Sequence, residues 1–237
     1  MDVQRLDKFI SSQFPDISRK DAREMIRRGE VRINGGTAKN PEQKIDSSSD
    51  EITLRGEAVG YKKHLYIMLN KPAGVVCASR DGLSETVIEL LPPHLRRKGL
   101  FPAGRLDKDT VGFVLITDDG DLAHRILSPK SHVPKRYYVR LRDDLRAGAE
   151  DIFSCGMTID GGEKCLPAEL KRLNSRECEV VLNEGKYHQI KRMFAVLENE
   201  VVYLKRTEIA GITLDPALAE GHARELSIDE LQCLQKR

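Results

Sequence analysis

The chain has 237 residues, of which 40% are hydrophobic and 32% charged, and its formal net charge is +2. At roughly 150 residues per domain, this length predicts a large domain with a small one attached. Its apolar runs are much shorter than the about 20 residues of a membrane helix, and residues 1–10 lack the apolar stretch of a signal peptide, so we expect a cytoplasmic protein with no membrane partner. The five scattered cysteines lack C-x-x-C spacing, which argues against disulfides and a zinc site.

Residues 1–60 are predicted to form a small helix–helix–hairpin module. The segments 5–14 and 17–29 carry apolar side chains at helical spacing, and residues 34–36 (Asn-Gly-Gly) lie between two alternating runs, as in a β-hairpin. Three arginines four apart share one face of the second helix, which is typical either of a solvated face or of a surface that contacts phosphates. These arginines are Arg19, Arg23 and Arg27.

Residues 61–237 alternate short β-rich runs with helical segments. Because the β-rich runs outnumber the helical ones, the pattern predicts a mixed, mainly antiparallel β-sheet flanked by helices. With the small module in front, this gives an α+β fold class. Between residues 122 and 142 the chain has six Lys or Arg and no Asp or Glu, a local excess that suits a polyanion although the net charge of the chain is small.

Two aspartates, Asp107 and Asp109, stand just before the apolar run FVLIT at residues 113–117. In an extended segment they would share one face, so they could be a catalytic pair, a metal pair, or one functional acid and one structural cap. The acids at residues 117–121 do not match a calcium loop, and 5% aromatic content with no Trp is little for a polysaccharide site. We therefore expect no metal, and a glycosidase is disfavoured.

Four stretches in chain order carry a resemblance to a known family: LNKPAGVVCAS, PAGRLDKDTVGFVLITDDGDL, SPKSHVPKRYYV and EGKYHQIKRMF. Over nearly all of residues 64–237 they are similar to the Rsu family of ribosomal RNA pseudouridine synthases, and residues 3–55 resemble the RNA-binding module first known from ribosomal protein S-four. The resemblance implies an RNA-binding domain over residues 1–60 and a catalytic domain over 61–237. It further implies that a monomer isomerises one uridine of ribosomal RNA without any cofactor.

The resemblance leaves the RNA target open. Small-subunit (16S) ribosomal RNA is favoured, because the approach LFPAGRLD at residues 100–107 looks most like that subgroup, but relatives that modify large-subunit (23S) RNA share the same motifs. A non-catalytic RNA-binding or ribosome-assembly protein is the hypothesis of another class. It is disfavoured because the three residues that the family would use, Asp107, Tyr137 and Lys191, are all present.

By resemblance, Asp107 of the Gly-Arg-Leu-Asp string is the catalytic residue. It would add to C1′ of the ribose, add to the base, or remove a proton from C2′, and the sequence does not distinguish these mechanisms. Because burial disfavours an ionised carboxylate, a cation is expected nearby, and Lys191 is the implied partner, with Arg192 as its substitute. Tyr137 is implied to stack on the uracil, whereas Tyr138 would point to the opposite face of a strand.

The remaining predicted residues contact RNA. A base in folded RNA must leave its stack to reach a pocket, and Arg105 matches the position where related synthases insert an arginine in its place. The structural alternative is a salt bridge from Arg105 to Asp109 or Asp118, in which Asp109 would hold Arg105 in place. By resemblance, Lys71 is expected in a turn near the substrate channel, and the alternative is a plain structural turn. The predicted RNA-binding set is completed by Arg19, Arg23, Arg27, Lys135 and Arg192.

Overall fold

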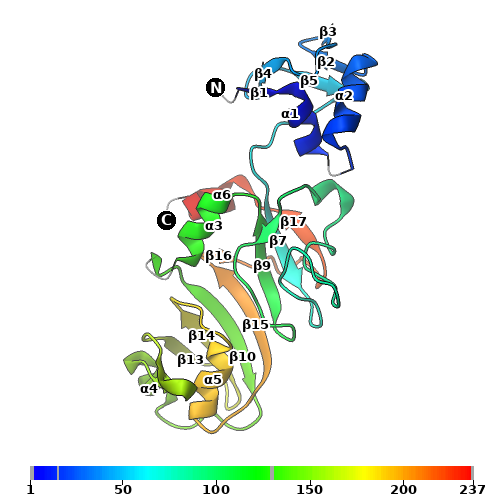
Figure 1. Ribbon diagram of the computed structural model, residues 1–237. Helices are drawn as coiled ribbons and strands as arrows, with labels where there is room; N and C mark the ends of the chain where they lie inside the picture. The colour runs from blue at the N-terminus through cyan, green and yellow to red at the C-terminus, as the bar shows by residue number, and fades with distance from the viewer. Residues whose placement is uncertain (1–2, 15, 129–130, 236–237) are drawn as a thin grey trace. The chain divides into compact units, whose positions relative to one another are not determined.

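The computed structural model describes residues 3–14, 16–128 and 131–235 of the chain (Figure 1). Helices are combined with strands that are mostly antiparallel, and the predicted α+β fold class is confirmed. Within the described residues, no helix is both long enough and apolar enough to cross a membrane.

The chain divides into two compact units. The first unit extends to Leu65 and also includes Pro93–Leu100, whereas the second comprises Tyr66–Pro92 and the chain from Phe101 onward. The sequence pattern did not indicate that Pro93–Leu100 belongs to the first unit. The guanidinium of Arg97 ties this segment to the rest of the unit, because it donates hydrogen bonds to the carbonyl oxygens of residues 62 and 63 at 2.6 and 2.7 Å.

The first unit consists of two short helices and two small antiparallel sheets, with strand orders β1-β4 and β3-β2-β5-β6. Apolar residues of both helices and of β2 and β5 form its core, as the helical spacing predicts. The turn between β2 and β3 contains Asn34 and Gly35 with positive φ angles of 48° and 80°, the conformation that a tight hairpin requires. Its elements are β1 (Val3–Arg5), α1 (Leu6–Gln13), α2 (Arg19–Arg27), β2 (Val31–Ile33), β3 (Gly36–Thr37), β4 (Lys44–Asp46), β5 (Ile52–Leu54) and β6 (Glu57–Ala58).

The second unit is built on a mixed sheet with the strand order β13-β14-β10-β15-β9-β7-β17, in which β16 pairs with β15 and β8 with β9. All of these pairs are antiparallel except β15 with β9. A small hairpin of β11 (Thr158–Ile159) and β12 (Glu163–Lys164) stands apart from it. The strands of the sheet are β7 (Tyr66–Lys71), β8 (Phe101–Pro102), β9 (Val111–Thr117), β10 (Lys135–Leu141), β13 (Glu169–Arg172), β14 (Glu177–Leu182), β15 (Val201–Ile209), β16 (Ile212–Thr213) and β17 (Ala223–Glu225).

Two pairs of helices pack on this sheet, and Figure 1 shows them towards opposite ends of it. The helices α3 (Gly120–Leu127) and α6 (Ile228–Gln235) contribute apolar side chains to one buried cluster together with residues of β9. The helices α4 (Ala149–Cys155) and α5 (Gln189–Val196) meet through two phenylalanine rings whose centroids are 5.1 Å apart. The first residues of α5 line the same cavity as residues of β10 and β14, where the candidate site is found.

The parallel pairing of β9 with β15 depends on a glycine. Gly112 is paired with Arg206 and has a φ of 100°, and a Cβ atom at this position would lie 2.3 Å from the carbonyl oxygen of Arg206. No side chain fits in that space, so only glycine allows the two backbones to approach. The approach brings the segment before β9, with its two aspartates, next to β15.

Candidate active site

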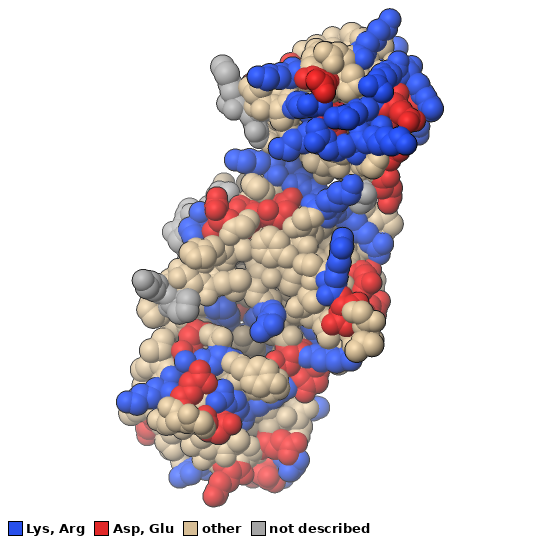
Figure 2. All heavy atoms as spheres, in the orientation of Figure 1, with Lys and Arg blue, Asp and Glu red and all other residues tan. Residues whose placement is uncertain are grey.

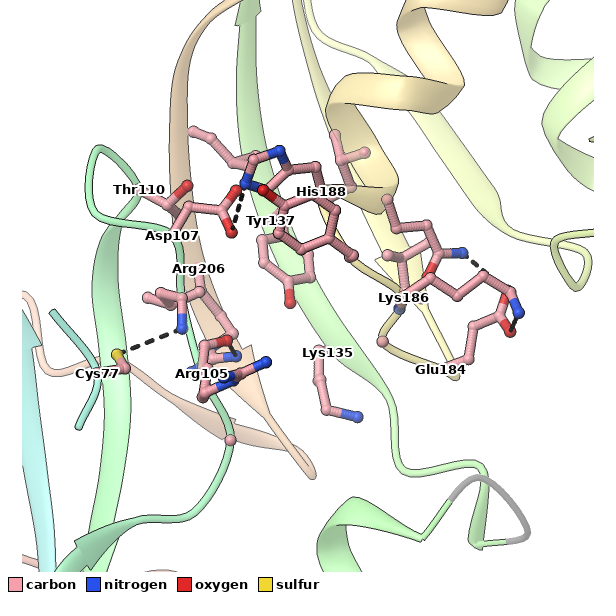
Figure 3. A pocket seen from close by; sticks show the side chains of 18 of the residues that line it. Cys77, Arg105, Asp107, Thr110, Lys135, Tyr137, Glu184, Lys186, His188 and Arg206 are labelled. Atoms are coloured by element: carbon pink, nitrogen blue, oxygen red, sulfur yellow. Dashed lines mark hydrogen bonds and ion pairs between the residues drawn. The ribbon is translucent and has the colours of Figure 1, made fainter. Parts of the chain in front are cut away.

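A cavity of about 590 Å³ opens in the second unit beside the segment that precedes β9 (Figure 3). Its walls come from β10, from β15, from residues 104–110 and from residues 182–190, which lead into α5. Parts of the chain that are far apart in sequence thus bring charged and aromatic side chains to one space. Among the lining residues are Arg105, Asp107, Lys135, Tyr137, Lys186, His188 and Arg206.

A buried lysine holds the 104–110 loop. Lys71 lies at the end of β7 with 0% exposure, and its Nζ donates hydrogen bonds to the carbonyl oxygens of Pro72 at 3.0 Å, Lys108 at 3.1 Å and Thr110 at 2.8 Å. Burial lowers the pKa of this ammonium group. Because its charged group is enclosed and fixes the loop, these contacts favour a structural role for Lys71 over the predicted contact with RNA.

Lys191 joins the two aspartates of the loop. Its Nζ is 3.2 Å from Asp107 Oδ2 and 2.7 Å from Asp109 Oδ1. Burial alone would lower the pKa of Lys191, but the hydrogen bonds to Asp109 and Asp107 outweigh it and raise the pKa. The same bond lowers the pKa of Asp109. With side-chain exposures of 28% and 74%, Asp107 lies in the cavity wall and Asp109 lies outside it, where it anchors the ammonium.

His188 lies on the other side of Asp107, and the sequence did not identify it. Its Nε2 is 3.5 Å from Asp107 Oδ1, and its ring stacks on the Tyr187 ring with a centroid separation of 3.8 Å. His188 is the N-cap residue of α5 and has a φ of 48°, a left-handed conformation that is uncommon outside glycine. Strain of this kind concentrates at functional sites, but only the coordinates reveal it.

The two tyrosines of β10 point in opposite directions. Tyr137 is 8% exposed and lines the cavity, whereas Tyr138 is on the other face, where its ring meets Tyr203 edge to face at 6.0 Å. Strand alternation predicts this arrangement, because neighbouring side chains of a strand point to opposite faces. The structure therefore brings the predicted tyrosine, and not its neighbour, into the wall that Asp107 shares.

Two further cations in the wall are almost enclosed. Lys135 is 8% and Arg206 2% exposed. The Lys135 Nζ donates to the carbonyl oxygen of Val133 at 3.0 Å, and the Arg206 Nε donates to that of Phe113 at 2.7 Å. Burial, reinforced by the charge of Arg206, lowers the pKa of Lys135 to about 8. The sequence predicted Lys135 as part of a basic stretch that contacts RNA, and it missed Arg206, because a strand pattern does not reveal a buried arginine.

Two other predicted basic residues, Arg105 and Arg192, differ in what they contact. Arg105 is exposed at the cavity (Figure 3). Asp109, one of its two predicted salt-bridge partners, binds Lys191 instead. Arg192 does not replace Lys191: its guanidinium binds Asp160 and, at 2.8 Å, Glu163. Arg192 thereby ties α5 to the β11–β12 hairpin, a structural role in place of the predicted RNA contact.

Three arginines of the first unit bind one buried carboxylate. Asp7 has a side-chain exposure of 0% and accepts hydrogen bonds from Arg23 Nε at 2.8 Å, Arg5 Nη2 at 2.9 Å and Arg19 Nη2 at 3.2 Å. Burial opposes its ionisation, but the bonds from Arg5, Arg23 and Arg19 outweigh it and hold the pKa of Asp7 far below its usual value. Arg27 is exposed, and Figure 2 shows Lys and Arg side chains gathered over this unit.

The arrangement in the cavity suits chemistry at a sugar or a base. A partly exposed carboxylate, flanked by an ammonium and an imidazole and sharing a wall with an aromatic ring, can act as a nucleophile or as a general base. Within the residues that the structure describes, no three His, Cys, Asp or Glu side chains are grouped closely enough to hold a metal ion.

Several known proteins are similar to this chain over nearly its whole length. The model of the RNA pseudouridylate synthase family matches residues 65–196, and the S4 domain model matches residues 4–52. The chain is 46% identical to the "Uncharacterized RNA pseudouridine synthase YtzG" of Bacillus subtilis, over 98% of both chains. It is 40% identical to the ribosomal small subunit pseudouridine synthase A of Escherichia coli, over 96% of this chain and 98% of that protein. A crystal structure of a pseudouridylate synthase is 39% identical and superposes with a TM-score of 0.69 over 98% of this chain and 99% of the other.

Proposed function

This chain belongs to the RNA pseudouridylate synthase family, and on that premise we propose that it isomerises one uridine of small-subunit ribosomal RNA, with Asp107 as the catalytic residue. Membership confirms the resemblance found in the sequence, and the chain is an RNA pseudouridine synthase. Relatives 42% and 40% identical over nearly their full length are named for the small ribosomal subunit. Their names support this target over large-subunit RNA, and the non-catalytic hypothesis is not retained.

The position of Asp107 carries the proposed mechanism. It lies in the cavity wall with an ammonium 3.2 Å from one carboxylate oxygen and an imidazole 3.5 Å from the other. The ammonium places a positive charge beside the carboxylate, and the two groups together orient it, as a nucleophile or general base requires. Tyr137 would stack on the uracil of the extruded nucleotide, and Arg105 would occupy the place that the base leaves in the RNA.

We also propose that the two parts of the chain have different functions. Residues 1–60 would bind RNA through α2, and residues 61–237 would carry out the isomerisation. The S4 domain match over residues 4–52 supports the first assignment. Phosphate contacts position a protein on RNA without reading its sequence, so the choice of uridine would be made at the cavity.

The first test is a change at Asp107. Asp107→Asn keeps the size of the side chain but removes its negative charge, so we expect conversion to fall by about three orders of magnitude or more, with RNA affinity nearly unchanged. Wild type and variant are expressed in a bacterium that lacks its own small-subunit synthase, and pseudouridine is mapped by carbodiimide modification and primer extension.

The matched control is Asp109→Asn, which keeps Asp107 and removes the exposed anchor of Lys191. We expect this variant to retain a measurable part of the conversion. Full conversion by Asp107→Asn would remove Asp107 from its assigned role. A new pseudouridine in large-subunit RNA alone would overturn the target and leave the chemistry intact.

A further inference from the structure

Lys135 and Arg206 are a pair of buried positive charges on neighbouring strands. Arg206 of β15 is in register with Tyr137 of β10, and Lys135 is two residues from that tyrosine on the same face. Both cations are more than nine-tenths buried, and within the described residues they donate hydrogen bonds to backbone carbonyl oxygens alone. Two desolvated charges of the same sign raise the energy of the folded protein unless an anion joins them.

Arg206 has unused hydrogen-bonding capacity. Its Nη2 atom has no partner among the described residues, and its Nη1 makes only a 3.5 Å contact with the carbonyl oxygen of Arg105. The Lys135 ammonium has three N–H groups, of which one is used by Val133. Buried polar groups are normally satisfied, so unsatisfied donors in a cavity wall are available to an acceptor that enters the cavity.

The acidic residues that line the cavity do not neutralise the positive charges of Lys135 and Arg206. Within the described part of the chain, no carboxylate forms an ion pair with Lys135 or Arg206. Each of the lining acids is already engaged with another group. Asp107 is bound to Lys191, Glu184 accepts from Gln189 at 2.8 Å, and Asp81 accepts from the N–H groups of Leu83 and Ser84.

We propose that Lys135, with Arg206 behind it, binds a backbone phosphate of the target nucleotide. This inference rests on the proposed function, because RNA brings a negative charge with every nucleotide. A phosphate fits better than a uracil carbonyl group, since only a full negative charge offsets two buried cations. The exposed Arg105 side chain at the same cavity adds a third positive charge (Figure 3).

The spacing along β10 agrees with one nucleotide. Residues two apart on a strand are separated by about 7 Å along it, so the Cα atoms of Lys135 and Tyr137 are about that far apart. A uracil stacked on Tyr137 would place its own ribose towards Asp107, and the adjoining phosphate would be within reach of Lys135. The subsite would thus fix the nucleotide at a point away from the reacting atoms, which favours a productive geometry.

The test isolates the charge of one phosphate. The probe is the dinucleotide UpU, compared by isothermal titration calorimetry with the same dinucleotide joined by a neutral methylphosphonate. A charge-assisted contact predicts that the full-length protein binds UpU about tenfold or more tightly than the neutral analogue. Equal affinities, or no binding of UpU at its highest soluble concentration, would overturn the proposal.

Variants then assign the effect to Lys135. Lys135→Met should remove the preference for the charged linkage, and Lys135→Arg should restore part of it. The control is Lys171→Met, which removes an exposed lysine of β13 outside the cavity and should keep the full preference. A preference that survives in Lys135→Met would show that the phosphate binds elsewhere.

Conversion of ribosomal RNA is measured on the same preparations. If Lys135→Met converts uridine with an unchanged KM and the wild type shows no charge preference, the subsite is overturned and the proposed function stands. If the wild type prefers the charged linkage but introduces no pseudouridine into small-subunit RNA, the subsite stands and the proposed function is overturned.

Discussion

Lys135 illustrates a residue at which stability and ligand binding oppose each other. Enclosure in the cavity wall beside Arg206 lowers the pKa of Lys135 from 10.5 to about 8. An unfolded chain holds the proton of this lysine more firmly than the folded protein does, so the charge destabilises the native state at neutral pH. Such a local loss of folding stability is common at sites that bind a ligand.

Replacement of this lysine by an apolar side chain should therefore stabilise the protein. The folded pKa is below the unfolded one, so the stability associated with the group is complete above pH 10.5 and is lost as the pH falls towards 8. We expect Lys135→Met to raise the unfolding free energy at pH 7 by about 2 kcal/mol, after subtraction of one lost hydrogen bond. Urea unfolding at pH 7 and near pH 10.5 measures the gain, which should shrink at the higher pH. A less stable variant at pH 7 would contradict this.

At the scale of elements, the site depends on the junction between β9 and β15. The predicted apolar run FVLIT is indeed buried, as all seven residues of β9 are. Its parallel pairing with β15 is confined to two residue pairs, and Gly112 is in one of them. That contact also places Arg206 in the wall of the cavity. One glycine thus links the loop of Asp107 to the strand that carries the buried arginine.

A methyl group at this glycine should disrupt the junction. In Gly112→Ala the new Cβ would be 2.3 Å from a backbone oxygen and would have to adopt a φ of 100°. Overpacking and strain together predict a loss of more than about 3 kcal/mol in unfolding free energy. Thermal unfolding compares this variant with Gly120→Ala at the start of α3, where nothing lies within 4 Å of an added Cβ and little change is expected. Equal melting temperatures for both variants would exclude the steric explanation.

Over the whole molecule, the sequence predicted what depends on local patterns and motifs. Helical spacing and an Asn-Gly-Gly turn indicated the first unit, and strand alternation favoured Tyr137 over Tyr138. The motifs predicted that Lys191 lies beside Asp107. Residues whose roles depend on tertiary contacts could not be predicted. Lys71 is enclosed by three carbonyl groups from two segments, and Arg206 is buried where β15 pairs with β9, a strand far from it in sequence. Neither role can be recognised from the spacing of polar and apolar residues in the sequence.

The distribution of charge leads to a prediction for RNA binding by the intact protein. Lys and Arg number 39 against 37 Asp and Glu, so attraction to RNA depends on where the cations lie rather than on the total. On α2, Asp7 binds both Arg23 at 2.8 Å and Arg19 at 3.2 Å, but the Arg19 side chain is more exposed, at 52% against 41%, and Arg27 is exposed as well. Arg19 and Arg27 are therefore the arginines of α2 that we expect to reach phosphates.

Removal of these two charges should weaken binding and reduce its salt dependence. Each lost phosphate contact lowers the slope of log affinity against log salt by about 0.7 to 0.9, so the double variant Arg19→Gln, Arg27→Gln should have a slope smaller by about 1.4 to 1.8. Filter binding of ribosomal RNA over a salt series measures it. Arg55→Gln is the control, because this arginine belongs to the same unit but is paired with Glu30 at 2.8 Å. A slope equal to that of the control would mean that the arginine face of α2 is solvated and that RNA is held elsewhere.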